Sequence, residues 1–481
     1  MNREPSRPTL LWFRRGLRVH DQPLFAGLAG PTLGVWVLDP RELLAIDALG
    51  FPRCGDRRLK FLLESVAELR AQLRGLGSEL LVRLGEPELV LPELMRETRA
   101  NRLRAVEEPG TEERAVEKRL LRTFAEDVSL GEFELLPAEA LFEMDDDPRA
   151  AARKLPEGFS KWRRKAEKHL EFALPYATPT PGSIEPWPSA AEAGELPTLT
   201  SLGRAEPADD PRGVLPFVGG ESAGLERLRQ WVFGGDHLRR YKETRNGMLG
   251  EAYSSKFSPW LALGCLSPRL VVQETLRYES ERTANDSTYW LRFELLWREF
   301  FRLYLLKHGA KLFRREGPAD RPLDYANRPQ HFEAWTSGGT GVPMVDANLR
   351  ELAATGFMSN RGRQNVASFL TKNLDVDWRW GARWFESQLI DYDVASNWGN
   401  WAYAAGVGAD PRGFRGFDVI GQGKRYDEQG AYVRHWLSDE LSPNGRHPHE
   451  PWKDGGPNPI VDVRRSLADA EARWGQAAPG H

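Results

Sequence analysis

Residues 9–21 read TLLWFRRGLRVHD, an apolar run followed by a basic turn. The run at 9–13 has the length of a β-strand, and similar runs follow it along the first third of the chain. They lie at 32–39, 79–84, 103–107 and 132–136. Between the second and third runs, apolar residues recur at helical spacing from Leu59 to Leu73. This alternation predicts a doubly wound, Rossmann-like parallel α/β domain over residues 8–140.

The first turn of this domain excludes two common nucleotide-binding motifs. Residues 13–18 read FRRGLR, without the glycine spacing of a dinucleotide site. The nearest approach to a P-loop, GQGKR at 421–425, lacks the earlier glycine and the hydroxyl residue. Neither nicotinamide nor P-loop chemistry is therefore expected.

Composition indicates a soluble globular protein rather than a disordered or membrane-spanning one. The chain has 481 residues, 17 tryptophans and a net charge of -3, with no apolar run long enough to span a bilayer. Cys54 and Cys265 lie far apart, so neither a disulfide nor a thiolate metal site is expected. We expect a cytoplasmic monomer without a membrane partner or a bound metal.

The rest of the chain divides into three further parts. A proline-rich connector is expected at 141–215, where 154–169 holds six Lys or Arg and predicts a positively charged turn or helix with a solvated face. A mostly α-helical domain is expected over 216–441. Its predicted helices lie at 286–307, with Asp286 and Ser287 as N-cap candidates, and at 345–354, 363–372 and 381–390. Residues 442–481, rich in Pro, Gly and His, are expected to be a disordered tail.

One cluster of residues in the helical half is suited to a phosphate. Tyr241 and Arg245 precede YSSKFSP at 253–259. Serine hydroxyls and backbone amides near a helix start can surround a pyrophosphate, and Lys256 would add positive charge. The same residues could equally form a helix cap.

A second cluster is suited to an isoalloxazine ring. NRGR at 360–363 is followed by DYD at 391–393 and by Asn397. A buried Arg stabilises the negative charge of a reduced flavin, while carboxylate and amide groups fix the polar edges of the ring. A purely structural pair between Arg363 and Asp391 is the alternative.

Longer motifs in the chain resemble the photolyase and cryptochrome family. They are FRRGLRxxD at 13–21, WREFF at 297–301, TGFMSNRGRQN at 355–365 and DYDxxSNWGNW at 391–401. The resemblance covers about residues 9–440 and is greatest to the cryptochrome DASH branch. Gln364 stands where cyclobutane-dimer photolyases tend to have Met, and Tyr403 where they tend to have a second Trp. The connector segment FSKWRRKAE at 159–167 also resembles that of the DASH branch.

The resemblance implies a folded FAD in the helical domain. Its implied binding residues are Tyr241, Ser254, Ser255, Lys256, Phe257, Ser258, Glu294, Asn360, Arg363, Asp391, Tyr392, Asp393 and Asn397. The implied electron relay runs from Tyr325 through Trp378 and Trp401 to the flavin. The family usually has Trp at the position of Tyr325. A folate antenna, 5,10-methenyltetrahydrofolate, would lie between the domains, with Glu113 as its contacting carboxylate.

The resemblance also implies a substrate and its contacts. Excited reduced FAD would donate an electron to a pyrimidine dimer in DNA, and the catalytic residues would be Glu294, Trp297, Asn360 and Asn397. The implied DNA-binding residues are Arg245, Trp297, Arg361, Gln364, Tyr403 and Gln422.

Three functions are therefore open at this point. The first is a photolyase that repairs cyclobutane pyrimidine dimers, with a preference for single strands, because flipping a base from single-stranded DNA costs less. The second is a blue-light photoreceptor that signals through DNA or a protein partner. The third is an α/β nucleotide-binding protein without flavin.

Overall fold

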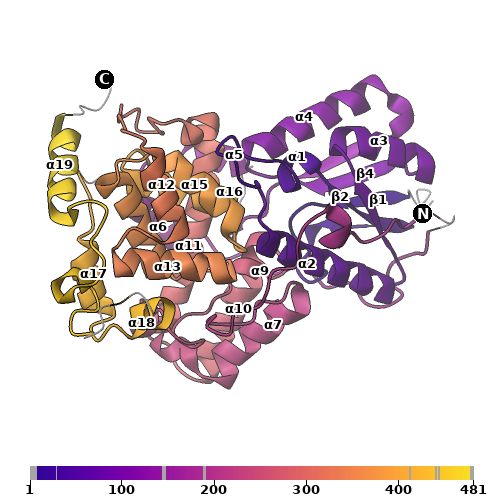
Figure 1. Cartoon of the computed structure of the whole chain (residues 1–481). Coiled ribbons are helices and arrows are strands. Elements are labelled where there is room, and N and C mark those ends of the chain that lie inside the picture. Colours follow the sequence, from indigo (N-terminus) through magenta and orange to yellow (C-terminus); the bar gives the residue numbers. More distant parts are fainter. Residues whose placement is uncertain are drawn as a thin grey trace.

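The computed structural model consists of an α/β domain and a larger helical domain that pack side by side (Figure 1). The structure describes residues 8–28, 30–143, 148–187, 191–410, 413–438, 441 and 445–476. Among these residues, none of the helices has the length and apolar character needed to cross a membrane. The cytoplasmic location remains a prediction.

The α/β domain contains a parallel five-stranded sheet in the order β3-β2-β1-β4-β5. Its elements are β1 Thr9–Phe13, β2 Thr32–Leu38, α1 Pro40–Leu43, α2 Asp56–Gly75, β3 Leu80–Leu84, α3 Pro87–Thr98, β4 Arg102–Val106, α4 Thr111–Glu126 and β5 Glu132–Leu136, with short 3-10 turns η1 Pro23–Phe25 and η2 Val128–Leu130. All five strands predicted from the sequence are confirmed, as is the doubly wound fold.

Alternate residues of β1 face two separate cores, which explains why the strand is apolar throughout. Leu11 and Phe13 belong to the larger core together with Leu59 of α2. Leu10 and Trp12 pack instead with apolar residues of α3 and α4. The central strand is thus covered by helices on both faces, as a parallel sheet requires.

The helical domain follows from residue 221. Its elements are α7 Glu221–Arg229, η4 Gln230–Gly234, η5 His237–Arg240, α8 Tyr241–Thr244, α9 Ser258–Leu263, α10 Pro268–Glu281, α11 Asp286–His308, η6 Gly309–Phe313, α12 Pro329–Ser337, α13 Pro343–Thr355, α14 Asn360–Ser368, η7 Phe369–Asn373, α15 Trp378–Gln388, α16 Val394–Ala405, α17 Val419–Tyr426 and α18 Ala431–Leu437. Here η4 and η7 are π-helical turns, and the others labelled η are 3-10 turns.

Two details of the predicted helices are corrected by the structure. The N-cap of α11 is Asn285, not Asp286 or Ser287, because the Asn285 side chain accepts hydrogen bonds from the N–H groups of Ser287 and Thr288. The helix predicted over 363–372 begins at Asn360 and changes to the π-helical turn η7 at Phe369.

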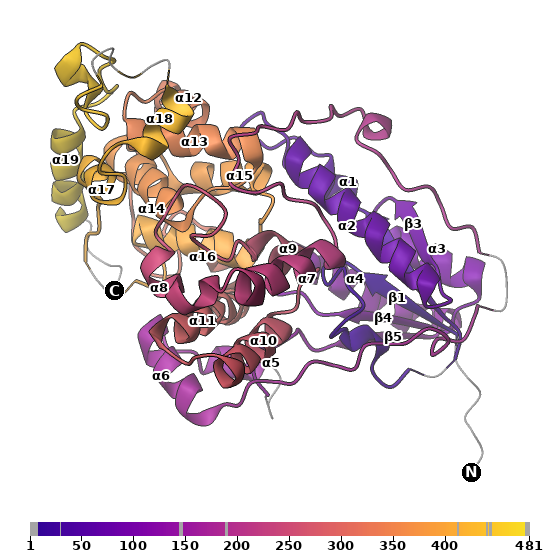
Figure 2. The ribbon, with the colours of Figure 1, turned by 90° about the horizontal axis from the view of Figure 1, so that it is seen from below.

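The connector between the domains contains helices α5 Pro148–Arg153 and α6 Phe159–His169, and the short turn η3 Thr200–Leu202. The basic segment is therefore a helix, α6, and it packs on α11. The Phe159 ring stacks on the Trp297 indole with centroids 3.6 Å apart and an angle of 12° between the planes. Figure 2 shows α6 beside α11 at the lower left of the molecule.

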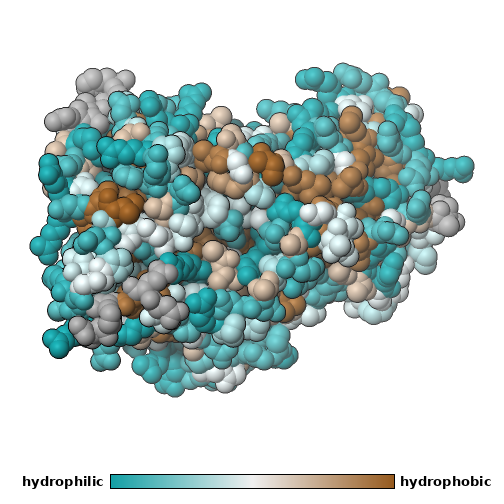
Figure 3. Space-filling model, viewed as in Figure 1, coloured by the Kyte–Doolittle hydropathy of each residue, from teal (hydrophilic) through white to brown (hydrophobic). Residues whose placement is uncertain are grey.

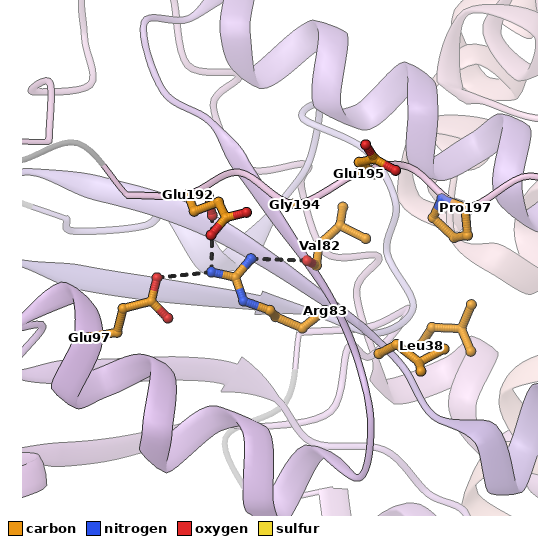
Figure 4. Close-up of a pocket in the computed structure, with 9 residues that line it drawn as sticks. Leu38, Val82, Arg83, Glu97, Glu192, Gly194, Glu195 and Pro197 are labelled. Atoms are coloured by element: carbon orange, nitrogen blue, oxygen red, sulfur yellow. Dashed lines mark hydrogen bonds and ion pairs between the residues drawn. The ribbon is translucent and has the colours of Figure 1, made fainter. Parts of the chain in front are cut away.

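A later part of the connector lies along the edge strand β3 (Figure 4). The Val82 N–H donates to the Ala193 carbonyl at 2.8 Å. Arg83 donates to the Glu192 carbonyl and forms an ion pair with Glu97 at 3.1 Å. A pocket of about 450 Å³ lies between this segment and the strand ends. Because Arg83 is already fully engaged there, we assign this pocket no ligand.

The tail predicted to be disordered is folded in its described part. Residues 445–476 include the 3-10 turn η8 Pro451–Asp454 and the helix α19 Val463–Gln476, at the left edge of Figure 1. Val463 and Ala470 are buried, and Val463 belongs to the larger core. The prediction was wrong because the abundance of Pro, Gly and His before residue 460 hid the short amphipathic helix that follows.

The two domains are joined by a buried polar network. The imidazole of His20, in the turn after β1, pairs with Glu221 of α7 at 2.6 Å and accepts a hydrogen bond from the Ser267 N–H. Arg18 is fully buried and donates to the Gly264 carbonyl of the helical domain.

The surface seen in Figure 3 is mostly hydrophilic, apart from an apolar band across its upper half.

Candidate functional site

A cavity of about 800 Å³ lies within the helical domain. Its walls come from α8, the segment 254–262, α11, α14, the segment 389–404 and residues 415–417. Every residue predicted to bind FAD lines it, and so do Trp297, Gln364, Trp401 and Tyr403. A pocket of this volume is in the range that holds ligands of cofactor size.

The loop Ser254–Ser258 forms one wall, and Arg227 supports it from behind. The Arg227 guanidinium donates to the carbonyls of Ser255 at 2.9 Å and Ser254 at 3.2 Å. Fixing these carbonyls away from the cavity leaves backbone N–H groups and serine hydroxyls for a pyrophosphate. The predicted phosphate loop is therefore in a suitable place.

The amine of Lys256, expected from the sequence to add positive charge at this loop, is bonded to the protein backbone. Its Nζ donates to the Glu251 carbonyl at 3.0 Å and lies 3.4 Å from the centre of the Tyr253 ring. Burial, together with the nearby Arg227, lowers the pKa of Lys256 to about 6. Burial thus disfavours the charged form of the side chain, whose amine is directed to the Glu251 carbonyl.

Arg363 and Asp391 form a bidentate ion pair in the cavity wall. Their two N–O distances are 3.0 and 2.7 Å. The pairing that stood as the structural alternative is thus present, and the pair also faces the cavity. It therefore places a cation and a carboxylate side by side, as the polar edge of an isoalloxazine requires.

Asp393 and Asn397 lie at the start of α16 in the same wall. Asp393 caps the helix by accepting from the Ser396 N–H at 2.8 Å. Burial alone would raise its pKa, but Arg298, Arg15 and Arg302 outweigh burial and hold the pKa of Asp393 below its usual range. The Asn397 side chain donates to the Ala382 carbonyl at 2.9 Å, which fixes the orientation of its amide.

Glu294 on α11 is held between a cation and an indole. Arg245 approaches it at 2.7 Å, and the Trp290 indole N–H donates to it at 3.0 Å. Burial raises the pKa of Glu294 even though Arg245 opposes this change. Arg245, predicted to contact the DNA backbone, is therefore part of the cavity wall and is paired there. Burial and the nearby Glu294 also raise the pKa of the buried Tyr241.

Trp297 and Tyr403 form an aromatic part of the cavity lining, which we call the mouth. Trp297 and Tyr403 meet edge to face with centroids 6.0 Å apart, and the outer side of Trp297 is covered by Phe159. Arg415 lies at this rim and donates to the Tyr403 hydroxyl at 3.0 Å. The arrangement suits a flat, apolar ligand with an anionic group beside it.

The remaining predicted DNA contacts form one network next to the cavity. Arg361 donates to Gln364 at 3.0 Å, to Gln422 at 3.2 Å and to Asn246 at 2.9 Å. The Arg361 guanidinium also lies 4.3 Å from the centre of the Tyr426 ring. These contacts bring α14 and α17 together beside Gln364, although Arg361 and Gln422 do not themselves line the cavity.

The residues of the predicted relay differ in their surroundings. Trp401 lines the cavity and is buried, and Trp378 is fully buried with its indole N–H donated to the Arg315 carbonyl. The Tyr325 hydroxyl is buried and has no hydrogen-bond partner among the described residues. Burial, with Asp377 and Asp375 nearby, raises the pKa of Tyr325 above its usual range.

Glu113 lies where the domains meet, on the first turn of α4. It is 4.0 Å from Arg15, whose guanidinium donates to the Ala262 carbonyl of the helical domain. Burial, more than the neighbouring Glu42, raises the pKa of Glu113 to about 7. Its contact with an antenna stays a prediction.

Trp290 and Arg415 are among the cavity residues that were not predicted from the sequence. Trp290 lines the cavity four residues before Glu294, on the same face of α11. That spacing was the available signal. Arg415 follows an irregular stretch of the chain, and no local pattern marks it.

Models of two known domains match this chain. The FAD-binding domain of DNA photolyase matches residues 290–476, and the DNA photolyase domain matches residues 9–183. Together with the fold and the cavity, these matches define a flavoprotein of the photolyase type.

Relatives along nearly the whole chain narrow the class. Cryptochrome DASH of Gloeobacter violaceus is 46% identical and covers 99% of this chain and 97% of its own. Cryptochrome DASH of Synechocystis is 47% identical, over 92% of this chain and 90% of its own. A crystal structure of a Synechocystis cryptochrome superposes with a TM-score of 0.90 at 43% identity, covering 98% of this chain and all of that one. A class III photolyase of Agrobacterium tumefaciens has a TM-score of 0.80 at 28% identity, covering 99% and 98%. The chain therefore belongs to the photolyase and cryptochrome family, within its cryptochrome DASH branch.

Proposed function

We propose that this flavoprotein uses blue light to repair cyclobutane pyrimidine dimers, preferentially in single-stranded DNA. The observation that carries the proposal is one cavity lined both by the Arg363–Asp391 pair and by the aromatic mouth of Trp297 and Tyr403. Reduced FAD, when bound and excited, supplies the electron that opens the cyclobutane ring and takes it back afterwards.

The protein residues would bind and orient the lesion. Trp297, supported by Phe159, offers a flat face on which a flipped dimer can stack. Glu294, held in the cavity wall by Arg245 and the Trp290 indole, would contact the polar edge of a pyrimidine in the dimer. Ser254, Ser255 and Ser258 would hold the FAD phosphates. Asn360 and Asn397 would contact the edges of the flavin and of the dimer.

The preference for single strands rests on Gln364 and Tyr403. A dimer must leave the base stack to enter the cavity, and this costs a few kcal/mol less in a single strand. Tyr403 gives a smaller stacking face than Trp, and its hydroxyl is already engaged with Arg415. We infer that the cavity contributes too little binding energy to extract a dimer efficiently from a duplex.

The test is repair by the photoreduced holoprotein of single-stranded and duplex oligonucleotides that carry one dimer. Loss of dimer under blue light, absent in the dark, is expected for the single strand, with much slower loss for the duplex. The double variant Gln364→Met, Tyr403→Trp should narrow the difference between the two substrates. Holoprotein that contains reduced FAD and repairs neither substrate would refute the proposal and leave the photoreceptor role.

A further inference from the structure

The C-terminal helix α19 contacts both ends of a segment that borders the cavity. We call residues 406–410 and 413–417 the rim segment. A side chain at Gly406 would place its Cβ 2.3 Å from Cη2 of Trp474, and one at Gly416 would lie 2.3 Å from Cδ1 of Leu467. Because glycine has no side chain, Trp474 packs against Gly406 at the beginning of the rim segment and Leu467 against Gly416 near its end.

The helix α19 is itself firmly attached to the turn η7. The Asn373 side chain donates to the Val463 carbonyl at 2.8 Å and to the Ser466 hydroxyl at 2.9 Å. Arg473 forms an ion pair with Asp375 at 3.1 Å. These contacts lie on the two ends of the helix, so they fix both its position and its rotation.

Trp474 is the main contact between α19 and the rim segment. Its indole meets the Phe414 ring edge to face, with centroids 6.2 Å apart. The Arg321 guanidinium lies 4.1 Å from its centre, and the Lys372 ammonium 5.0 Å. Because a cation is attracted to the face of an aromatic ring, Arg321 and Lys372 add to the apolar contact of Trp474 with the rim segment.

The rim segment ends in two cavity residues, Arg415 and Phe417. The Arg415 side chain is 41% exposed, donates to the Tyr403 hydroxyl and lies 3.7 Å from Asp410. The Phe417 N–H donates to the Ser368 hydroxyl at 2.9 Å. Arg415 thus presents an accessible cation beside the aromatic mouth, next to the part of the rim segment that Trp474 contacts.

We propose that α19 is a positioning element of the substrate site, which holds the rim segment so that Arg415 meets a phosphate of the DNA strand at the cavity mouth. This inference rests on the proposed function. In this proposal, α19 is a structural support of the substrate site. It acts on substrate binding through Arg415 and not through the flavin, because the contacts given above for α19 involve no predicted FAD-binding residue.

Binding of a dimer-containing single strand to the holoprotein at several salt concentrations tests the proposal. Trp474→Ala should weaken binding roughly tenfold, as expected for one lost charge-assisted contact. It should also make the salt dependence of log K less steep by about 0.7, the value for one phosphate contact on a single strand. Arg415→Ala should give the same two changes, and the double variant no further loss.

The controls separate positioning from general destabilisation. Trp474→Phe keeps an aromatic ring on the rim segment and should bind nearly as the wild type does. Trp452→Ala removes another indole of the tail, on η8, and should leave affinity and salt dependence unchanged. Bound FAD should be retained in every variant.

Three outcomes would overturn the proposal. The first is wild-type affinity and salt dependence in Trp474→Ala. The second is additive losses in the double variant, which would mean that α19 does not act through Arg415. The third is loss of FAD from Trp474→Ala. A wild-type holoprotein that fails to bind the strand at all would instead refute the proposed function, and this inference with it.

Discussion

Lys256 belongs to the phosphate loop Ser254–Ser258, and its buried amine affects how stability responds to pH. Its pKa falls from the ordinary value of 10.5 to about 6 in the folded chain. Between these values the unfolded chain binds more protons, so the free energy of unfolding rises as pH rises. We expect the denaturation midpoint of the wild type to increase from pH 7 to pH 9, and to increase less in Lys256→Met.

The matched control is Lys242→Met, because Lys242 pairs with Asp286 at the exposed surface. It should leave the pH dependence as in the wild type. Lys256→Met should also retain FAD, since Nζ faces the Glu251 carbonyl and not the loop. A large loss of FAD affinity would show that Lys256 contributes its charge to the cofactor after all.

Tyr325 is poorly placed to end an electron relay. Oxidation of a tyrosine requires its proton to leave, and the buried hydroxyl of Tyr325 has no acceptor among the described residues. We therefore expect Tyr325→Phe to change the rate of flavin photoreduction less than about twofold. Trp401→Phe and Trp378→Phe should lower that rate strongly. Monitoring flavin photoreduction by its absorbance separates these cases. A severe loss of photoreduction rate in Tyr325→Phe would place the tyrosine in the relay.

Whole elements were predicted well where periodicity was long, and poorly where a few contacts decide the outcome. The strands of the sheet and the long helix α11 follow from apolar patterns alone. The cap of α11, in contrast, depends on which of three neighbouring polar side chains turns back to the backbone. The helix α19 is stabilised by contacts with η7 that a local pattern cannot reveal.

At the same scale, α6 supports the cavity wall. Phe159 stacks on Trp297, so Phe159→Ala would remove a buried ring at a cost of about 3 kcal/mol and leave one face of the indole without contact. We expect a lower thermal midpoint together with weaker binding of dimer-containing single strands.

Phe172→Ala is the control for this variant. It removes a comparable stack, on Phe142 with centroids 5.0 Å apart, in the same connector. It should lower stability without weakening binding of the lesion. Equal effects of the two variants on lesion binding would refute a specific role for the stack on Trp297.

On the scale of the whole molecule, Glu221 fastens the two domains together. It accepts from the Val19 N–H at 2.6 Å and pairs with His20 at 2.6 Å, and it is only 4% exposed. Glu221→Ala would leave these buried donors unpaired, at a cost of about 3 kcal/mol. We expect a lower thermal midpoint and faster proteolysis of the connector.

Glu221→Gln keeps an acceptor and should fall between the wild type and Glu221→Ala in both measurements. Proteolysis and melting of Glu221→Ala that match the wild type would mean that other contacts, such as Arg18 with the Gly264 carbonyl, suffice to join the domains.

The long motifs predicted which residues form the site. They did not predict the pKa values and ion pairs of those residues. Arg363, Asp391 and Asn397 belong to motifs that the family resemblance covers, and they line one cavity. The lowered pKa of Lys256 and the pairing of Arg245 with Glu294 depend on burial and on side-chain direction. Residue order alone specifies neither of these.

The connector segment along β3 makes the α/β domain less independent than its sheet suggests. The Val82 N–H at the sheet edge is paired with Ala193, which lies well beyond the last strand of the domain. A fragment that ended near residue 140 would expose this edge to other chains, where strand pairing promotes aggregation. Recombination between relatives at the apparent domain boundary would therefore have to carry the connector with the first domain to yield a well-behaved chimera.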